Sequence, residues 1–231
     1  DVDILISDFL TYQLITKEQA KLLKVATSDN VLKLDKDIKD EVRARIFKNM
    51  LVNLNEVLKY AEEHNCAIGS FNTPNLENMV AVISAAEELN VPVIIMHAQC
   101  HEQDAHLDIV GPVMLLMAKR AKVPVCVHLD HCEDLDYLKR AIDLGFTSVM
   151  LDASSKPYDE NVRMTKEAVR LAHAKNVSVE AEIGVLGGRE AGDQKPLTKE
   201  EMYTDPELAK RFVEDTHIDA LACSFGTAHG I

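Results

Sequence analysis

The feature that most constrains the fold of this chain is a repeated pattern that begins at Ala67: a short apolar run, a polar turn and an amphipathic helix pattern. The apolar runs cover residues 67–72, 92–97, 123–128, 148–152, 178–183 and 220–225. Most are almost continuously apolar, as is typical of parallel strands covered on both faces. This alternation therefore predicts an α/β protein with a parallel sheet.

Helix patterns separate these runs at residues 76–89, 135–144, 165–175 and 206–214. Gly145 follows the second of them and is expected to end that helix in a left-handed conformation. Asp205 precedes Pro206, a pairing that is typical of an N-cap followed by the first helical residue. These signals support the strand and helix assignment.

Polar residues stand at the carboxyl ends of the predicted strands, namely Asn72, His97, Asp130, His131, Asp152, Glu182 and His229. In a (β/α)₈ TIM barrel these ends form the active-site face, whereas an open doubly wound sheet binds ligands only near its switch point. We therefore expect a TIM barrel over residues 50–231 with about six of its eight strands present. Residues 1–49, with a candidate strand at 2–7, are expected to be a separate segment of uncertain origin.

Composition excludes several classes of function. The net charge of −13 argues against a nucleic-acid binder, because phosphate binding needs clustered Lys and Arg. No apolar run approaches the roughly 20 residues of a membrane helix, and the acidic first residues do not form a signal peptide. Five cysteines without a C-x-x-C pair indicate reduced thiols, so we expect a cytoplasmic protein.

The strongest candidate site is His128-Leu129-Asp130-His131, directly after an apolar run. Side chains alternate along a strand, so His128 and Asp130 share a face while His131 lies at the turn. An imidazole at a strand end can bind a divalent metal, and the neighbouring carboxylate can donate or accept a proton. A polar surface loop explains the motif equally well.

Two further segments carry candidate residues. Small residues surround His229, so that backbone and a metal or phosphate could approach closely, although a tight turn with an exposed histidine is the simpler explanation. Glu180 and Glu182 share a strand face, where buried carboxylates need a metal or hydrogen-bond donors. The glycine-rich residues 184–192 that follow indicate either a mobile loop carrying Glu190 or a solvated surface loop.

The remaining polar positions have simpler explanations when taken singly. Asp152 can cap a turn, and Asn72 can form one before Pro74. The spacing of His97, Cys100, His101 and His106 fits no standard zinc pattern. Taken together, the histidines and carboxylates at successive strand ends suggest a metal-assisted reaction on an oxygen-rich small molecule.

With these residues in view, the chain from about Met50 onward resembles the class II, metal-dependent fructose-bisphosphate and tagatose-bisphosphate aldolases. The resemblance is closest in four blocks, at residues 128–131, 141–154, 178–184 and 225–230. It implies a TIM barrel and a zinc-dependent lyase of carbohydrate metabolism and glycolysis. The reaction so implied is the reversible aldol cleavage of a ketose bisphosphate into dihydroxyacetone phosphate and an aldehyde.

The resemblance also implies roles for single residues. His131 and His229 correspond to two of the three zinc histidines, and the third is expected beyond residue 231. Asp130 corresponds to the acid/base for the aldehyde half, and Glu190 to a catalytic glutamate on a mobile loop. Two carboxylates, Asp152 and Glu182, correspond to ligands of a second divalent or a monovalent cation. Positions that line the dihydroxyacetone-phosphate half of the substrate site correspond to Asn72 and Gly230.

Departures from the family pattern keep other functions open. The third histidine and the last two strands with their phosphate donors are not in the chain, and Arg189 stands where relatives often have an acidic residue. A non-catalytic binding or regulatory protein on a truncated aldolase barrel is therefore the main alternative. Another metal-dependent sugar-phosphate enzyme, such as an isomerase or epimerase, is a third. We expect a homo-oligomer, dimer or tetramer, with low activity for a single chain.

Overall fold

The computed structural model describes residues 50–184 and 203–225. The chain divides into two units, residues 1–49 and 50–231, and every described residue belongs to the second. The candidate strand expected at residues 2–7 lies outside the described residues.

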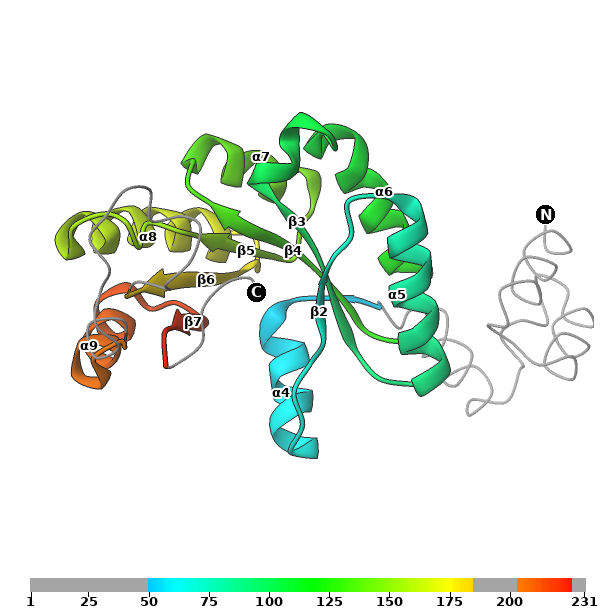
Figure 1. The fold of residues 1–231 in the computed structure, drawn as a ribbon, viewed down its shortest axis with the longest axis horizontal. Coiled ribbons are helices and arrows are strands. Elements are labelled where there is room, and N and C mark those ends of the chain that lie inside the picture. The colour runs from blue at the N-terminus through cyan, green and yellow to red at the C-terminus, as the bar shows by residue number, and fades with distance from the viewer. Residues whose placement is uncertain (1–49, 185–202, 226–231) are drawn as a thin grey trace, which may run out of the picture. The chain divides into compact units, whose positions relative to one another are not determined.

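The centre of the described unit is one sheet whose strands all pair in parallel. Six strands follow one another in the order β2-β3-β4-β5-β6-β7 (Figure 1). Their bounds are β2 Ser70–Asn72, β3 Val93–Ala98, β4 Val125–Cys132, β5 Ser148–Leu151, β6 Ser178–Ile183 and β7 Ala220–Cys223. A further short strand, β1 (Leu51–Val52), pairs with Val125 and Cys126 at the start of β4.

The predicted fold class is confirmed. All six strands expected from the apolar runs are present in their expected order, and they form a parallel half-barrel that corresponds to six strands of a TIM barrel. Strand β1, by contrast, was not expected, because two residues are too short to give a hydrophobic pattern.

Helices connect successive strands. Their bounds are α4 Leu54–His64, α5 Leu76–Leu89, α6 Leu107–Arg120, α7 Leu135–Leu144, α8 Tyr158–His173 and α9 Pro206–Thr216, with a short 3₁₀ helix, η2, at Gln99–Gln103. Gly145 ends α7 with φ 110°, and Asp205 caps α9 through its side chain, both as predicted. Helices α4 and α6 were not among the predicted ones. The Gly111-Pro112 pair, which lies inside α6, is a helix-breaking signal that its buried apolar side overrides.

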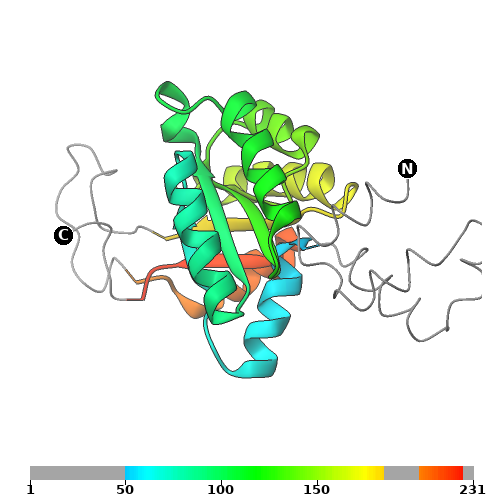
Figure 2. The same cartoon turned by 90° about the vertical axis from the view of Figure 1, so that its right-hand side faces the viewer.

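Alternation along the strands separates two packed faces. Ile95, Val125 and Val127 lie in the main core with buried residues of α5, α6 and α7. Their neighbours Ile94 and Cys126 point to the other face, where they pack against Leu54 and Val57 of α4. Successive strand residues point to opposite faces, so the connecting helices cover the outer face and α4 covers part of the inner face (Figures 1 and 2).

Helix α4 is held at the amino ends of the strands. The Asn55 side chain donates to Oδ1 of Asp219, just before β7, over 2.6 Å. The backbone N–H of the same residue donates to Oγ of Ser178, the first residue of β6, over 3.4 Å. These contacts place α4 at the end of the inner face opposite to the carboxyl ends, where the candidate residues lie. Within the described residues, no helix combines the length and apolar character needed to cross a membrane.

Candidate active site

The carboxyl end of β4 carries the densest group of candidate residues. The strand continues through His131 to Cys132, where the sequence predicted a turn, and its pairing with β5 shifts register between Leu129 and Cys132. His131 has φ 42°, which is unusual for a residue other than glycine. This irregularity changes the alternation at the strand end, so the orientation of His131 does not follow from counting residues.

Three candidate residues come together at this end of the sheet. His131 on β4, Asp152 directly after β5 and Glu182 on β6 each offer one ligand atom, and these atoms all lie within 4.8 Å of one another. Glu182 is buried, and 10% of the Asp152 side chain and 27% of the His131 side chain are exposed. Among the described residues, this is the group that could hold a metal ion.

Asp152 and His131 form a charged hydrogen bond. Nδ1 of His131 lies 3.0 Å from Oδ2 of Asp152. This hydrogen bond is the main cause that raises the pKa of His131 to about 9, with burial opposing it. Burial acts to raise the pKa of Asp152, but the hydrogen bonds from His131 and Ser154 outweigh it and the pKa is lowered. The pair is therefore an imidazolium and a carboxylate at neutral pH, and a metal would displace a proton from His131.

Further along the inner face, His128 lies between Ser148 and Glu180. Its Nδ1 is 2.8 Å from Oγ of Ser148, and its Nε2 is 3.5 Å from Oε2 of Glu180. Burial lowers the pKa of His128 to about 4. Burial also raises the pKa of Glu180 to about 7, and the negative charge of Asp130 adds to this rise. The low polarity at this depth therefore favours the neutral forms of both residues.

The donor set fits a divalent metal ion. One imidazole and two carboxylates from three neighbouring strands converge at one point, and such mixed nitrogen and oxygen ligands suit zinc. The Asp130 carboxylate lies close enough to this group to act on the pKa values of His128, His131 and Glu180.

The other predicted site residues are placed differently. Asn72 is exposed at the end of β2, where it pairs with Met96 of β3, and it is not part of the group of candidate ligands. Glu190, His229 and Gly230 lie outside the described residues. The structure therefore brings together His131, Asp152 and Glu182 from the predicted set.

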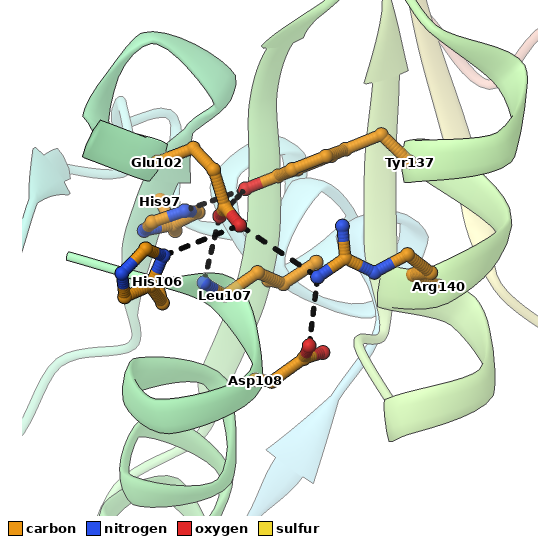
Figure 3. Close-up of polar contacts among 7 residues, drawn as sticks. All are labelled: His97, Glu102, His106, Leu107, Asp108, Tyr137 and Arg140. Atoms are coloured by element: carbon orange, nitrogen blue, oxygen red, sulfur yellow. Dashed lines mark hydrogen bonds and ion pairs between the residues drawn. The ribbon is translucent and has the colours of Figure 1, made fainter.

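The placement of His97 on the active-site face was wrong. His97 is fully buried and shares the outer face with Ile95, because residues two apart on a strand point the same way. Its Nε2 lies 3.0 Å from the hydroxyl oxygen of Tyr137 on α7, a helix of the outer layer (Figure 3). Burial lowers the pKa of His97 to about 4, so the ring is neutral.

Figure 3 shows the network that His97 joins. The Tyr137 hydroxyl donates to Oε2 of Glu102 over 2.7 Å, and the N–H of Leu107 donates to the same oxygen over 2.8 Å. Arg140 lies 3.7 Å from Oε1 of Glu102 and 2.8 Å from Oδ2 of Asp108. The network joins η2, the start of α6 and α7, so its role is to hold the outer layer at the ends of β3 and β4.

The roles implied by the family resemblance did not include His128, Glu180 or Ser154, although His128 and Glu180 lie in segments that the sequence had marked as candidates. For the first two a signal was present, since His128 shares a strand face with Asp130 and Glu180 shares one with Glu182. Ser154 donates to Asp152 through both its hydroxyl and its backbone N–H. The only sequence signal for this contact is the turn-forming character of Asp152-Ala153-Ser154.

Several aldolases are similar in sequence to this chain. The chain is 45% identical over 184 residues to the fructose-bisphosphate aldolase of Giardia intestinalis, covering 78% of this chain and 55% of that protein. It is 42% identical over 188 residues to the 6-phospho-5-dehydro-2-deoxy-D-gluconate aldolase of Halalkalibacterium halodurans, covering 62% of that protein. The chain thus spans somewhat more than half the length of these relatives.

Solved structures of aldolases are also similar to this chain. The YdjI aldolase of Escherichia coli K12 superposes with a TM-score of 0.69 at 35% identity, over 78% of this chain and 64% of that one. A crystal structure described as a putative fructose-1,6-bisphosphate aldolase from Coccidioides immitis gives a TM-score of 0.68, also at 35% identity, over 78% of this chain and 62% of that one.

The family matches divide the chain close to its unit boundary. Residues 1–52 match a different family, the CtsR C-terminal dimerization domain. Residues 52–231 match the family described as class-II fructose-bisphosphate aldolase. With this match and the relatives above, the chain belongs, through its larger part, to the class-II fructose-bisphosphate aldolase family.

Proposed function

We propose that this protein is a metal-dependent aldolase. Its reaction is the reversible cleavage of fructose or tagatose 1,6-bisphosphate into dihydroxyacetone phosphate and a three-carbon aldehyde phosphate. The observation that carries the proposal is the convergence of His131, Asp152 and Glu182 within 4.8 Å on a chain of this family. The relatives named as fructose-bisphosphate aldolases supply the substrate class.

Each candidate residue has a proposed role in this reaction. His131, Asp152 and Glu182 would hold the metal, together with His229. When bound, a divalent cation stabilises as a Lewis acid the negative charge that develops on the ketose oxygen. Asp130 accepts the proton of the C4 hydroxyl during cleavage and returns it during condensation. Glu190 exchanges the proton at the ketose carbon, and Asn72 and Gly230 line the dihydroxyacetone-phosphate half.

We also propose a separate role for the first segment. The match of residues 1–52 to a dimerization domain supports a homodimer held together through this segment. Light scattering of the full chain should then give about twice the monomer mass of 25.7 kDa. A monomer at all concentrations would contradict this assignment.

The protein is proposed to work in the cytoplasm. All five cysteines are unpaired, which fits a reducing compartment. Its partners are phosphorylated sugars, and the charge of −13 leaves no general attraction for nucleic acids.

A coupled assay for triose-phosphate release tests the proposal. The full chain is incubated with fructose 1,6-bisphosphate, tagatose 1,6-bisphosphate or 6-phospho-5-dehydro-2-deoxy-D-gluconate, with and without a chelator. The expected result is slow cleavage that the chelator abolishes, that zinc restores and that Asp130→Ala lacks. The third substrate is included because one relative is named for it.

Two further measurements separate the alternatives. A folded chain that binds zinc with a measurable stoichiometry but cleaves no substrate would favour a non-catalytic aldolase-like protein with a binding role. Product analysis that finds conversion of a sugar phosphate without carbon–carbon cleavage would favour an isomerase or epimerase.

A further inference from the structure

Both oxygens of the Asp152 carboxylate are engaged. Oδ2 accepts from Nδ1 of His131 over 3.0 Å. Oδ1 accepts from the Ser154 hydroxyl over 2.7 Å and from the Ser154 backbone N–H over 3.1 Å. A carboxylate bound at both oxygens cannot rotate without breaking a hydrogen bond, so its plane is set by residues on two sides.

The backbone holds this carboxylate next to β4. The N–H of Asp152 donates to the carbonyl oxygen of Cys132 over 2.8 Å, which ties the end of β5 to the residue after His131. The main chain is therefore fixed on both strands. What remains to be fixed is the side chain of Asp152 itself, and Ser154 contacts the oxygen that His131 does not use.

The hydrogen bond with Asp152 matters for the orientation of the His131 ring, because the strand does not set that orientation. Its backbone has φ 42° and lies at the register shift of β4, so the pleat of the sheet does not set the direction of its ring. The hydrogen bond to Asp152 orients the ring instead. When Nδ1 donates to a carboxylate, Nε2 becomes the nitrogen whose lone pair faces a metal.

We propose that Ser154 is a positioning residue of the metal site, which fixes Asp152 so that Asp152 orients the His131 ring. The proposal rests on the proposed metal-dependent function and assigns Asp152 a role through His131 in addition to its place among the ligands. A carboxylate that orients a metal-bound histidine typically changes metal affinity 10- to 100-fold when it is disturbed.

A purely structural role for Ser154 predicts something different. The backbone N–H of residue 154 closes the turn after β5 whatever side chain stands there, so Ser154→Ala retains that hydrogen bond. The substitution removes only the hydroxyl that contacts Oδ1. An effect on the metal site without an effect on folding therefore separates positioning from turn formation.

The chain offers matched variants. Ser154→Thr retains a hydroxyl at the same position, and the neighbouring Ser155 is exposed and lies outside the group of candidate ligands. The affinity of the full chain and of Ser154→Ala, Ser154→Thr and Ser155→Ala for Zn²⁺ is measured by competition with a chromophoric chelator. Urea unfolding of each metal-free variant reports on folding.

The expected result is an affinity about 10- to 100-fold weaker for Ser154→Ala, near wild type for Ser154→Thr, and unchanged for Ser155→Ala. An affinity of Ser154→Ala equal to that of the wild type would overturn the proposal. So would an equal loss in Ser154→Thr, because the hydroxyl would then not be the cause.

A second measurement does not depend on metal binding. In a metal-free crystal structure of Ser154→Ala, Asp152 should rotate and its contact with Nδ1 of His131 should be lost. An Asp152–His131 pair that stays at the wild-type distance would overturn the positioning role. If the wild-type chain binds no zinc, the proposed function fails, and this structure still decides whether Ser154 positions the pair.

Discussion

Nδ1 of His131 on β4 lies 3.0 Å from Oδ2 of Asp152, the first residue after β5. An imidazolium from β4 and a carboxylate that follows the neighbouring parallel strand, β5, thus share one hydrogen bond. It lies at the carboxyl ends of the strands, where the sequence analysis predicted the candidate residues. Glu182 on the next strand completes a group whose ligand atoms lie within 4.8 Å of one another. This arrangement is the structural basis of the proposed metal site.

Replacing the Glu182 carboxylate by an amide should weaken metal binding. Glu182→Gln keeps the size of this buried side chain but removes its charge, and the hydrogen bond from Asn161 to the Glu182 carbonyl oxygen is retained. We expect the affinity for Zn²⁺ to fall at least about 10-fold, with little change in folding. Isothermal titration with Zn²⁺ measures it. Glu160→Gln, an exposed position on α8, is the control, and equal affinities for both variants would contradict the assignment.

Tyr137→Phe should destabilise the outer layer. The substitution removes the hydroxyl that accepts from His97 and donates to Glu102, and it leaves the fully buried His97 without that partner. An unsatisfied buried polar group costs about 1–3 kcal/mol, which is the expected loss in free energy of unfolding. Urea unfolding followed by circular dichroism measures it. Tyr203→Phe, at an exposed tyrosine, should change the free energy by less than about 0.5 kcal/mol.

His97 should make stability depend on pH. Burial lowers its pKa from 6.5 to about 4, so between these values the unfolded chain binds more protons than the folded chain. The contribution is therefore present above about pH 6.5, and it is lost as the pH falls toward 4. From pH 7 to pH 5 this one group should remove about 2 kcal/mol of unfolding free energy.

His97→Gln isolates that contribution. A glutamine amide can still donate to Tyr137 but does not titrate, so the variant should lose about 2 kcal/mol less than the wild type between pH 7 and pH 5. Comparing the two proteins at each pH removes the effect of Glu180, whose raised pKa acts in the opposite direction. If the free energy of unfolding changed with pH by the same amount in both proteins, His97 would not be the buried neutral ring that the structure contains.

The strands could be predicted because their signal is local. The run of alternating polar and apolar residues at 178–183 located β6 at its observed bounds, and the apolar run at 92–97 located β3 within one residue at each end. The end of β4 was less accurate, because its polar residues Asp130 and His131 look like a turn while the backbone remains in the sheet. Polar residues at a strand end carry no signal that separates pairing from a loop.

The face of each side chain was predictable in part. Counting by two from Ile95 places His97 on the outer face, and this simple count contradicts the grouping of all polar strand ends into one site. Counting fails for His131, since a register shift with a left-handed residue changes its direction. His131 and Asp152 are 21 positions apart in sequence, and their contact depends on how β4 packs beside β5. No local sequence pattern indicates such a contact.

The position of helix α4 could not be predicted from the sequence either. Leu54 and Val57 give it a narrow apolar side, and the pattern does not indicate that this side covers Ile94 and Cys126 on the inner face of the sheet. The hydrogen bonds of Asn55 to Ser178 and Asp219 fix that position, and they join residues more than 120 positions apart. Such contacts form only when distant segments of the chain have come together in the sheet, so no local pattern predicts them.

A crystal of the full chain grown with Zn²⁺ would show whether these strand ends hold a metal ion. An anomalous difference map at the zinc absorption edge locates the ion without assumptions about ligands. We expect one strong peak within bonding distance of His131 and of at least one of Asp152 and Glu182, and no such peak in a His131→Ala crystal. A fully folded protein with no peak there, or with its zinc bound elsewhere, would contradict the proposed metal site.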